Sequence, residues 1–120
     1  MSLKVLIIDD TAVDRDNLKN LLQSKGYSVL TADEGAAGIE IARKESPDLV
    51  LLDVVMPGKS GFEICRAMKK DGEIKDIPIV MVTSKNQKAD KVMSGLQGAA
   101  GHIGKPFDAD DVLDVVAKFA

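Results

Sequence analysis

The sequence predicts a single α/β domain built on a parallel sheet with helices on both faces. Short apolar runs rich in β-branched residues alternate about five times with segments of helical periodicity along its 120 residues. Most of these runs are apolar at successive positions, as expected of strands buried on both faces. No linker, repeat or low-complexity tract interrupts the alternation, and an ordinary domain takes about 150 residues, so residues 1–120 are expected to form one domain.

Five segments are predicted as strands because each is short, apolar and bounded by polar or turn-forming residues. They are residues 4–8, 27–32, 49–52, 78–82 and 101–104. Pro78 is acceptable as the first residue of the fourth strand, where a missing N–H costs little. The last of the five is short and carries the weakest pattern.

Five helices are predicted between and after these strands. In the first, Leu18, Leu21 and Leu22 share one face, and Gly26 follows its end as the residue that terminates the helix. The next three helices cover residues 35–45, 62–70 and 88–96. The last is marked by apolar residues at helical spacing, namely Val112, Val115, Val116 and Phe119. Asp108 is its expected N-cap.

The composition excludes several classes of function. The net charge of −3 and the shortage of aromatic residues disfavour a nucleic-acid reader, which needs a basic surface. No apolar run approaches the roughly 18 residues of a membrane span, and the N-terminus lacks the features of a signal peptide, so a cytoplasmic location is expected. The single cysteine, Cys65, rules out an internal disulfide, fits a reducing compartment and is expected to pack in the core.

Polar residues follow four of the five predicted strands. Asp9 and Asp10 come after the first, Asp53 after the third, Thr83 and Ser84 after the fourth, and Lys105 and Pro106 after the fifth. The carboxyl ends of parallel strands meet at one edge of the sheet, which is where ligands of open α/β folds bind. We therefore expect these side chains to lie close together.

Such a group of side chains is suited to phosphoryl transfer. Asp9, Asp10 and Asp53 offer hard oxygen ligands without imidazole or thiolate, which favours Mg²⁺, or Mn²⁺, over Zn²⁺. Lys105 supplies a cation and Thr83 a hydroxyl donor. Asp53 would be the nucleophile and would form an acyl phosphate, with the charge of the moving group offset by the metal and the lysine.

Each motif also has a purely structural interpretation. An Asp-Asp pair before a helix can serve only as an N-cap, and Asp53 can simply end a buried strand. Thr83-Ser84 can be a loop, and Lys105-Pro106-Phe107 a turn before a helix. Only the occurrence of all four motifs, in this order and at strand ends, is specific.

The complete motif set resembles the receiver domain of bacterial two-component response regulators. It consists of Asp9-Asp10, Asp53 with Met56-Pro57 and Gly61, Thr83-Ser84, and Lys105-Pro106-Phe107. The resemblance covers essentially the whole chain and is closest in plan to stand-alone receivers of the CheY type. It implies a flavodoxin-like, doubly wound, five-stranded parallel sheet in the order 2-1-3-4-5 with five helices, and the strand order follows from the resemblance alone, as in CheY.

The resemblance also assigns roles to residues. Asp53 corresponds to the phospho-acceptor, Asp10 to the acid that ligates Mg²⁺ directly, and Asp9 to the acid that acts mainly through water. Val55 corresponds to the residue whose backbone carbonyl ligates the metal. Lys105 corresponds to the phosphate-pairing lysine, and the family commonly has a cis peptide bond before the following proline.

The remaining predicted positions belong to a switch and partner surface. Thr83 corresponds to the hydroxyl that swings onto the phosphoryl group, and Ser84, Lys85 and Pro106 flank it. His102 stands where the family usually has Tyr or Phe, so it is expected either to move inward behind Thr83, to contact a partner, or to be only a partly exposed ring.

The function implied is a phospho-switch rather than a turnover enzyme. Its partners would be a sensor histidine kinase or phosphotransfer protein and a downstream target protein, without nucleic acid or membrane, in chemotaxis or twitching motility or in a phosphorelay. With no output domain expected, the target would be a separate protein.

Three alternatives remain open. The first is an Asp-nucleophile phosphatase of the haloacid-dehalogenase type, in which an Asp would be expected at the position of Val55. The others are a flavodoxin-like redox or nucleotide binder and a pseudo-receiver scaffold.

Overall fold

The computed structural model describes residues 3–120 and contains five strands and five helices in strict alternation. The strands are β1 (Lys4–Ile8), β2 (Ser28–Ala32), β3 (Leu49–Leu52), β4 (Ile79–Thr83) and β5 (Gly101–Gly104). The helices are α1 (Ala12–Ser24), α2 (Gly35–Glu45), α3 (Gly61–Lys70), α4 (Lys88–Leu96) and α5 (Ala109–Ala117). Every predicted element is confirmed.

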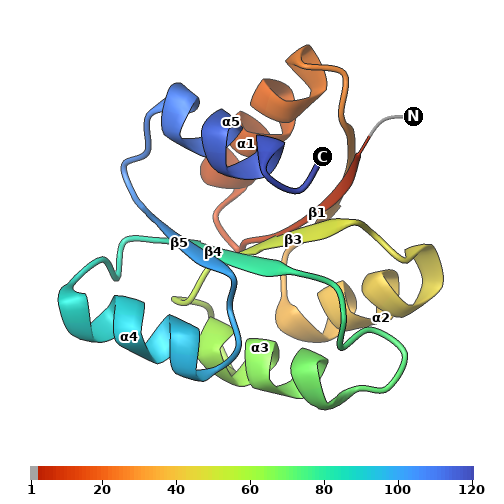
Figure 1. Cartoon of the computed structure of the whole chain (residues 1–120), viewed down its shortest axis with the longest axis vertical. Helices are drawn as coiled ribbons and strands as arrows, with labels where there is room; N and C mark the ends of the chain where they lie inside the picture. Colours follow the sequence, from red (N-terminus) through yellow and green to blue (C-terminus); the bar gives the residue numbers. More distant parts are fainter. Residues whose placement is uncertain (1–2) are drawn as a thin grey trace.

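The strands form one parallel sheet in the order β2-β1-β3-β4-β5. Helices α1 and α5 cover one face of the sheet, and α2, α3 and α4 cover the other (Figure 1). The chain runs outward from β1 in both directions, and its order reverses between β1 and β3. The carboxyl ends of these two strands therefore lie side by side at the edge where ligands of such folds bind.

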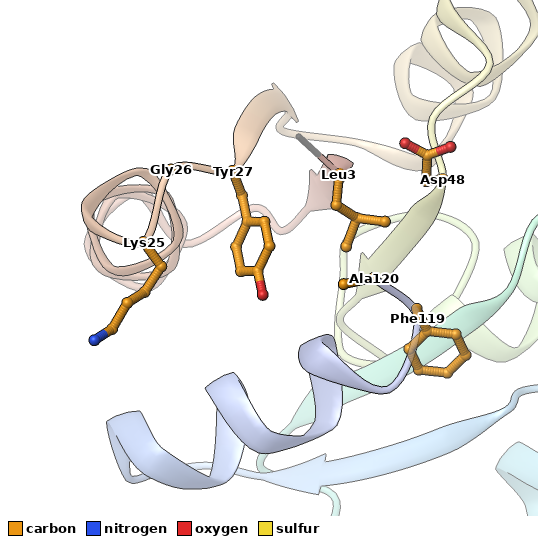
Figure 2. Close-up of a pocket in the computed structure, with 7 residues that line it drawn as sticks. All are labelled: Leu3, Lys25, Gly26, Tyr27, Asp48, Phe119 and Ala120. Atoms are coloured by element: carbon orange, nitrogen blue, oxygen red, sulfur yellow. The ribbon is translucent and has the colours of Figure 1, made fainter. Parts of the chain in front are cut away.

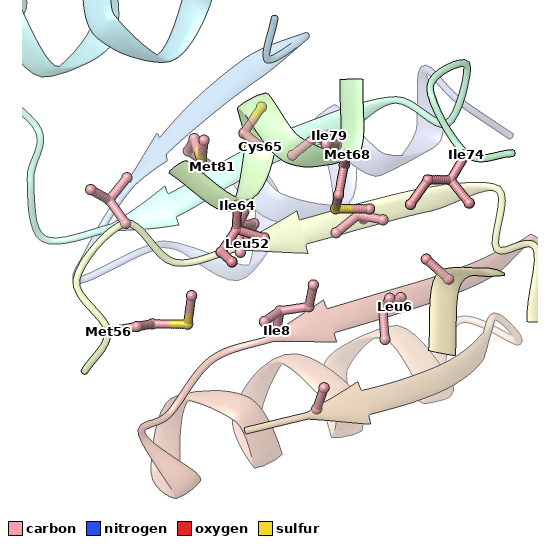
Figure 3. Close-up of a cluster of buried hydrophobic side chains, with 14 residues drawn as sticks. Leu6, Ile8, Leu52, Met56, Ile64, Cys65, Met68, Ile74, Ile79 and Met81 are labelled. Atoms are coloured by element: carbon pink, nitrogen blue, oxygen red, sulfur yellow. The ribbon is translucent and has the colours of Figure 1, made fainter. Parts of the chain in front are cut away.

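Alternate side chains of each strand feed two separate hydrophobic cores. Leu6 and Ile8 of β1 face α2 and α3, where they meet Leu52, Ile64 and Met68 (Figure 3). The other core lies under α1 and α5. It contains, among others, Val5, Ile7, Leu18, Leu22, Leu51, Val80, Val112 and Val116. All of these are almost completely buried, which explains why the central strands are apolar at successive positions.

The helix ends agree with the sequence in most respects. Gly26 follows the C-cap of α1 with φ of 84°, a left-handed conformation that costs glycine little. Ser60 caps α3 by accepting a hydrogen bond from the backbone N–H of Glu63 at 3.3 Å. Asp108 holds the N-cap position of α5 as predicted, but its side chain accepts no capping hydrogen bond.

Candidate functional site

Two acidic residues continue directly from the central strands β1 and β3. The backbone N–H of Asp9 donates to the carbonyl of Ala32 at 3.1 Å, and that of Asp53 donates to the carbonyl of Ile8 at 3.0 Å. These bonds extend the sheet ladder by one residue, so the backbone of both acids is held by the neighbouring strand. The two residues are nearly buried, with whole-residue exposures of 1% for Asp9 and 5% for Asp53.

Lys105, just after β5, brings its ammonium group to these acids. Its Nζ donates to Asp9 Oδ2 at 2.8 Å and to Asp53 Oδ2 at 3.1 Å. A third hydrogen bond of 2.8 Å reaches Asp14 Oδ2 on α1. The backbone N–H of Lys105 is fixed as well, because it donates to the carbonyl of Thr83 at 2.9 Å. The predicted meeting of strand ends therefore holds for the acids and the lysine.

Three carboxylates at this edge could hold a metal ion. Asp9, Asp10 and Asp53 each offer one oxygen, and these oxygens lie within 4.8 Å of one another. Asp10 is exposed, whereas the other two are buried, so the cluster opens toward solvent on one side. Oxygen ligands without nitrogen or sulfur suit Mg²⁺, which commonly uses one or two carboxylates and several waters. The residues present therefore fit the predicted ion.

The electrostatics of the site follow from burial and charge. Burial raises the pKa of the Asp9 carboxyl, and the hydrogen bonds from Lys105 and from the Thr11 N–H only partly oppose this. For Lys105, burial acts against the charged form, but the hydrogen bonds to Asp14, Asp9 and Asp53 outweigh it and raise its pKa. Lys105 is therefore firmly cationic at neutral pH.

Asp14 is the site residue that sequence reasoning missed. It lies in the first turn of α1, where an acidic residue has an ordinary structural interpretation as a partner of the helix dipole. Its position one helical turn after the Asp9-Asp10 pair is the only sequence signal that it faces the same edge. The contact with Lys105 depends on packing between the two ends of the chain.

The N-cap interpretation of the two acids is wrong. Thr11 occupies the N-cap of α1. Asp9 Oδ1 accepts the backbone N–H of Thr11 at 2.9 Å, and Arg15 donates to the backbone carbonyl of Asp9 at 2.8 Å. These bonds orient the Asp9 carboxylate between α1 and Lys105.

Four other predicted site residues line the same pocket as the acids. Its lining consists of Asp10, Thr11, Asp14, Asp53, Val55, Ser84, Lys105 and Pro106. The backbone N–H of Val55 donates to Asp53 Oδ1 at 3.1 Å, which fixes the second oxygen of that carboxylate. The peptide bond between Lys105 and Pro106 is cis, as the resemblance implied.

Thr83 is not among the residues that line this pocket. Its side chain is completely buried, and its Oγ1 accepts the backbone N–H of Lys85 at 3.2 Å. The hydroxyl is therefore engaged within the β4–α4 connection. The Nζ of Lys85 is near Asp90 of α4, at 4.0 Å.

His102 on β5 is half-buried and joined to the β4–α4 connection and to α4. Its Nε2 lies 2.8 Å from the carbonyl oxygen of Lys85, and its Nδ1 lies 2.7 Å from Ser94 Oγ. A carbonyl only accepts, so Nε2 carries a proton. The ring is thus partly exposed on the edge strand β5, and both of its nitrogens have partners on neighbouring segments.

A second hollow lies at the opposite edge of the sheet, where the strands begin (Figure 2). Leu3, Tyr27 and Ala120 face it, next to Phe119 and Asp48. It contains none of the predicted site residues and brings together no cluster of carboxylates. This hollow therefore offers no competing site for the predicted chemistry.

Fold and site together define a response regulator receiver domain. The family model for the "response regulator receiver domain" matches residues 5–117, so the chain belongs to this family. It is a CheY-like signalling domain. The phosphatase, flavodoxin and nucleotide-binder alternatives are thereby replaced by a signalling class.

Individual relatives agree with this assignment. The chain is 41% identical over 113 residues to Protein PilH of Pseudomonas aeruginosa, covering 94% of this chain and 93% of that protein. Among solved structures it is similar to the chemotaxis protein CheY4 of Vibrio cholerae, with a TM-score of 0.93, 32% identity and complete coverage (100%) of both chains. A putative response regulator from Chloroflexus aurantiacus superposes with a TM-score of 0.94 at 27% identity, over 99% of this chain and 98% of that one.

Within residues 3–120, no helix has the length and apolar character needed to cross a membrane. The longest, α1, has 13 residues and a mixed surface.

Proposed function

We propose that this chain is a stand-alone receiver that accepts a phosphoryl group on Asp53 from a phosphohistidine of a sensor kinase or phosphotransfer protein. The observation that carries the proposal is the placement of Asp53. Its carboxylate is nearly buried, accepts a hydrogen bond from Lys105 at 3.1 Å, and shares an edge with Asp9 and Asp10. A carboxylate so placed is oriented for attack, and a cation is at hand for the charge that arrives.

In the proposed reaction, a carboxylate oxygen of Asp53 attacks the phosphorus and forms an acyl phosphate. The bond from phosphorus to the donor nitrogen breaks, and the imidazole leaves with the bonding electrons. The Lys105 ammonium offsets charge on the phosphoryl oxygens. Val55 holds the other Asp53 oxygen through its N–H, which limits rotation of the carboxylate.

Asp10, Asp9 and Asp53, with the backbone carbonyl of Val55, would hold the divalent ion. When bound, Mg²⁺, or Mn²⁺ in its place, neutralises negative charge on the reacting groups. The single positive charge of Lys105 does not balance these three carboxylates and Asp14, and their mutual repulsion is a further reason why a divalent ion fits this cluster.

The signal would leave through the surface around the β4–α4 connection. Phosphate on Asp53 would draw Thr83 away from the Lys85 N–H and shift an existing equilibrium between two arrangements of the connection. Ser84, Lys85, Pro106 and His102 would then present a changed surface to a downstream target protein. The similarity to a chemotaxis protein supports a chemotaxis- or motility-type pathway.

The similarity extends over 93% of PilH and 100% of CheY4, so these two relatives are matched over almost their whole length. We propose a signalling acceptor that only takes and slowly loses its own phosphoryl group, rather than an enzyme that turns over a separate substrate.

The test is incubation with acetyl phosphate and Mg²⁺ followed by intact-protein mass spectrometry. The expected result is one added phosphoryl group that hydroxylamine removes, as it does from an acyl phosphate, and that is absent from Asp53→Asn and from samples with EDTA. An unmodified wild-type protein that binds Mg²⁺, or labelling of Asp53→Asn at the wild-type level, would overturn the proposal.

A further inference from the structure

Asp14 competes with the other carboxylates for Lys105. The distance from Lys105 Nζ to Asp14 Oδ2, 2.8 Å, equals that to Asp9 and is shorter than the 3.1 Å to Asp53. An ammonium group has three N–H donors. All three are therefore used in this arrangement, one by each carboxylate.

A phosphoryl group on Asp53 changes this balance. It brings a charge of about −1.5 to −2 and three strong acceptor oxygens to a place beside Lys105. For the ammonium to donate to a phosphoryl oxygen, one of its present acceptors must be given up. The question is which carboxylate can lose its bond at the smallest cost.

Burial identifies Asp14 as that carboxylate. The side chain of Asp9 is 2% exposed, so loss of the cation there would leave a buried charge poorly compensated. The side chain of Asp14 is 32% exposed and stands on the pocket side of α1, where water can replace the lost bond. Asp53 is the residue that is modified.

We propose that Asp14 is a positioning residue that holds Lys105 in the resting state and must release it when Asp53 is phosphorylated. The inference rests on the proposed function of Asp53 and deepens it. Asp14 withholds one donor of Lys105 from the incoming group and leaves a negative charge close to it. Both effects lower the phosphorylated fraction at a given donor concentration and so raise the threshold of the switch.

A merely structural role for Asp14 makes a different prediction. An acid in the first turn of α1 stabilises the helix through its dipole, and its loss would lower the stability without changing the affinity for a phosphoryl mimic. Asp16 is the matched control because it lies on the same helix, carries the same charge and is exposed. Asp14→Glu keeps the charge at the site.

The experiment compares wild type, Asp14→Asn, Asp14→Glu and Asp16→Asn in two sets of measurements. The first set, made with Mg²⁺, is the rate of labelling by acetyl phosphate and the concentration of beryllofluoride that gives half-saturation, followed by ¹⁹F NMR. Asp14→Asn is expected to be labelled about fivefold faster and to bind beryllofluoride about fivefold more tightly, as the loss of one nearby screened charge allows. Asp16→Asn and Asp14→Glu are expected to stay within about twofold of wild type.

The second measurement is made without metal. The ¹⁵Nζ NMR signal of Lys105 is expected to shift in Asp14→Asn and to stay in place in Asp16→Asn. If the wild type is labelled and the labelling rate of Asp14→Asn is equal or lower, this inference alone is overturned. The same holds if the ¹⁵Nζ signal of Lys105 does not shift in Asp14→Asn. If wild type and all variants bind Mg²⁺ but take up no label, the proposed function of Asp53 fails and this inference fails with it.

Discussion

Gly61, the first residue of α3, lies against the main-chain carbonyl of Asp53 so closely that a Cβ atom has no room between them. Such a Cβ would also lie 2.7 Å from the Cα of Val54. The backbone N–H of Gly61 donates to the Val54 carbonyl at 2.8 Å, which ties the start of α3 to the segment after β3. The glycine thus allows the helix to pack directly beneath the phospho-acceptor proposed here.

Gly61→Ala is therefore expected to destabilise the protein by about 1–3 kcal/mol, because backbone atoms are not able to move aside as a flexible side chain does. Urea unfolding measures this change. Gly72→Ala is the matched control, since nothing lies within 4 Å of a Cβ at that position. Its effect is expected to stay within about 0.5 kcal/mol, and equal losses for the two variants would contradict the packing argument.

Lys105→Met removes the cation that three carboxylates share. Without a divalent ion, the variant is expected to be less stable than wild type by about 1–3 kcal/mol, because Asp9 and Asp53 then face each other nearly buried and uncompensated. Because Mg²⁺ would relieve the same repulsion, the gain in stability on adding Mg²⁺ should be larger in the variant. Thermal unfolding in EDTA and in Mg²⁺ measures both, with the exposed loop residue Lys59→Met as control. An equal gain in stability from Mg²⁺ in wild type and in Lys105→Met would count against the view that Lys105 and the ion contact the same carboxylate oxygens.

The same lysine predicts an alkaline limit to stability. Hydrogen bonds to the carboxylates raise the pKa of Lys105 in the folded state above its value in the unfolded chain. Its contribution is therefore complete below the unfolded pKa of about 10.4 and decreases as the pH rises from there through the folded pKa. The stability difference between wild type and Lys105→Met should be constant from pH 7 to about 10 and should shrink at higher pH. A difference that already declines between pH 7 and 9 would contradict this sign.

Cys65 should be an unreactive thiol. It is completely buried on α3, its Sγ donates to the carbonyl of Gln97 at 3.3 Å, and burial raises its pKa to about 11. At pH 8 the native protein should react with a disulfide reagent at least about 100-fold more slowly than the urea-unfolded protein, because little thiolate is present and access is blocked. The rate of thiol titration with and without urea checks this, and similar rates would be inconsistent with the buried position.

His102→Phe should loosen the β4–α4 connection. It removes the hydrogen bonds to the Lys85 carbonyl and to Ser94 Oγ while keeping an aromatic ring on β5, and the expected loss of stability is about 1–2 kcal/mol. Amide hydrogen exchange of residues 84–88 should become faster. Ser94→Ala serves as the comparison, because it removes the Nδ1 partner and leaves the bond from Nε2. Exchange that is faster in Ser94→Ala than in His102→Phe would place the restraint on α4 instead.

Much of the fold could be predicted from local pattern. The ranges of β1, α2, β3, α4 and β5 coincide with the predicted ones, and the starts of β2 and α3 and both bounds of β4 differ by one residue. The period of apolar residues is set by whether a segment is buried on one face or two, and this is visible along the chain. The order of the strands could not be predicted from local pattern, because the pattern of each segment carries no information about its neighbours in the sheet. That order came from the resemblance to receiver domains.

The site also contains features that local pattern predicts and features that depend on the folded chain. Asp9, Asp10, Asp53 and Lys105 were recognisable because polar residues that directly follow buried strands meet at one edge of a parallel sheet. Thr83 was recognised as well, yet the direction of its hydroxyl, toward the Lys85 N–H, depends on the path of the β4–α4 connection.

Local sequence pattern was enough to establish the class of fold, the edge that carries the chemistry and most of the charged groups there, because burial periodicity and strand ends are properties of short segments. Two contacts became visible only once the chain was folded: Asp14 shares Lys105, a residue 91 positions away in the chain, and Gly61 lies against the backbone of Asp53 with no room for a Cβ atom. Contacts of this kind arise when crossovers bring distant segments together. Their energies depend on distances of a few ångströms that no local pattern records.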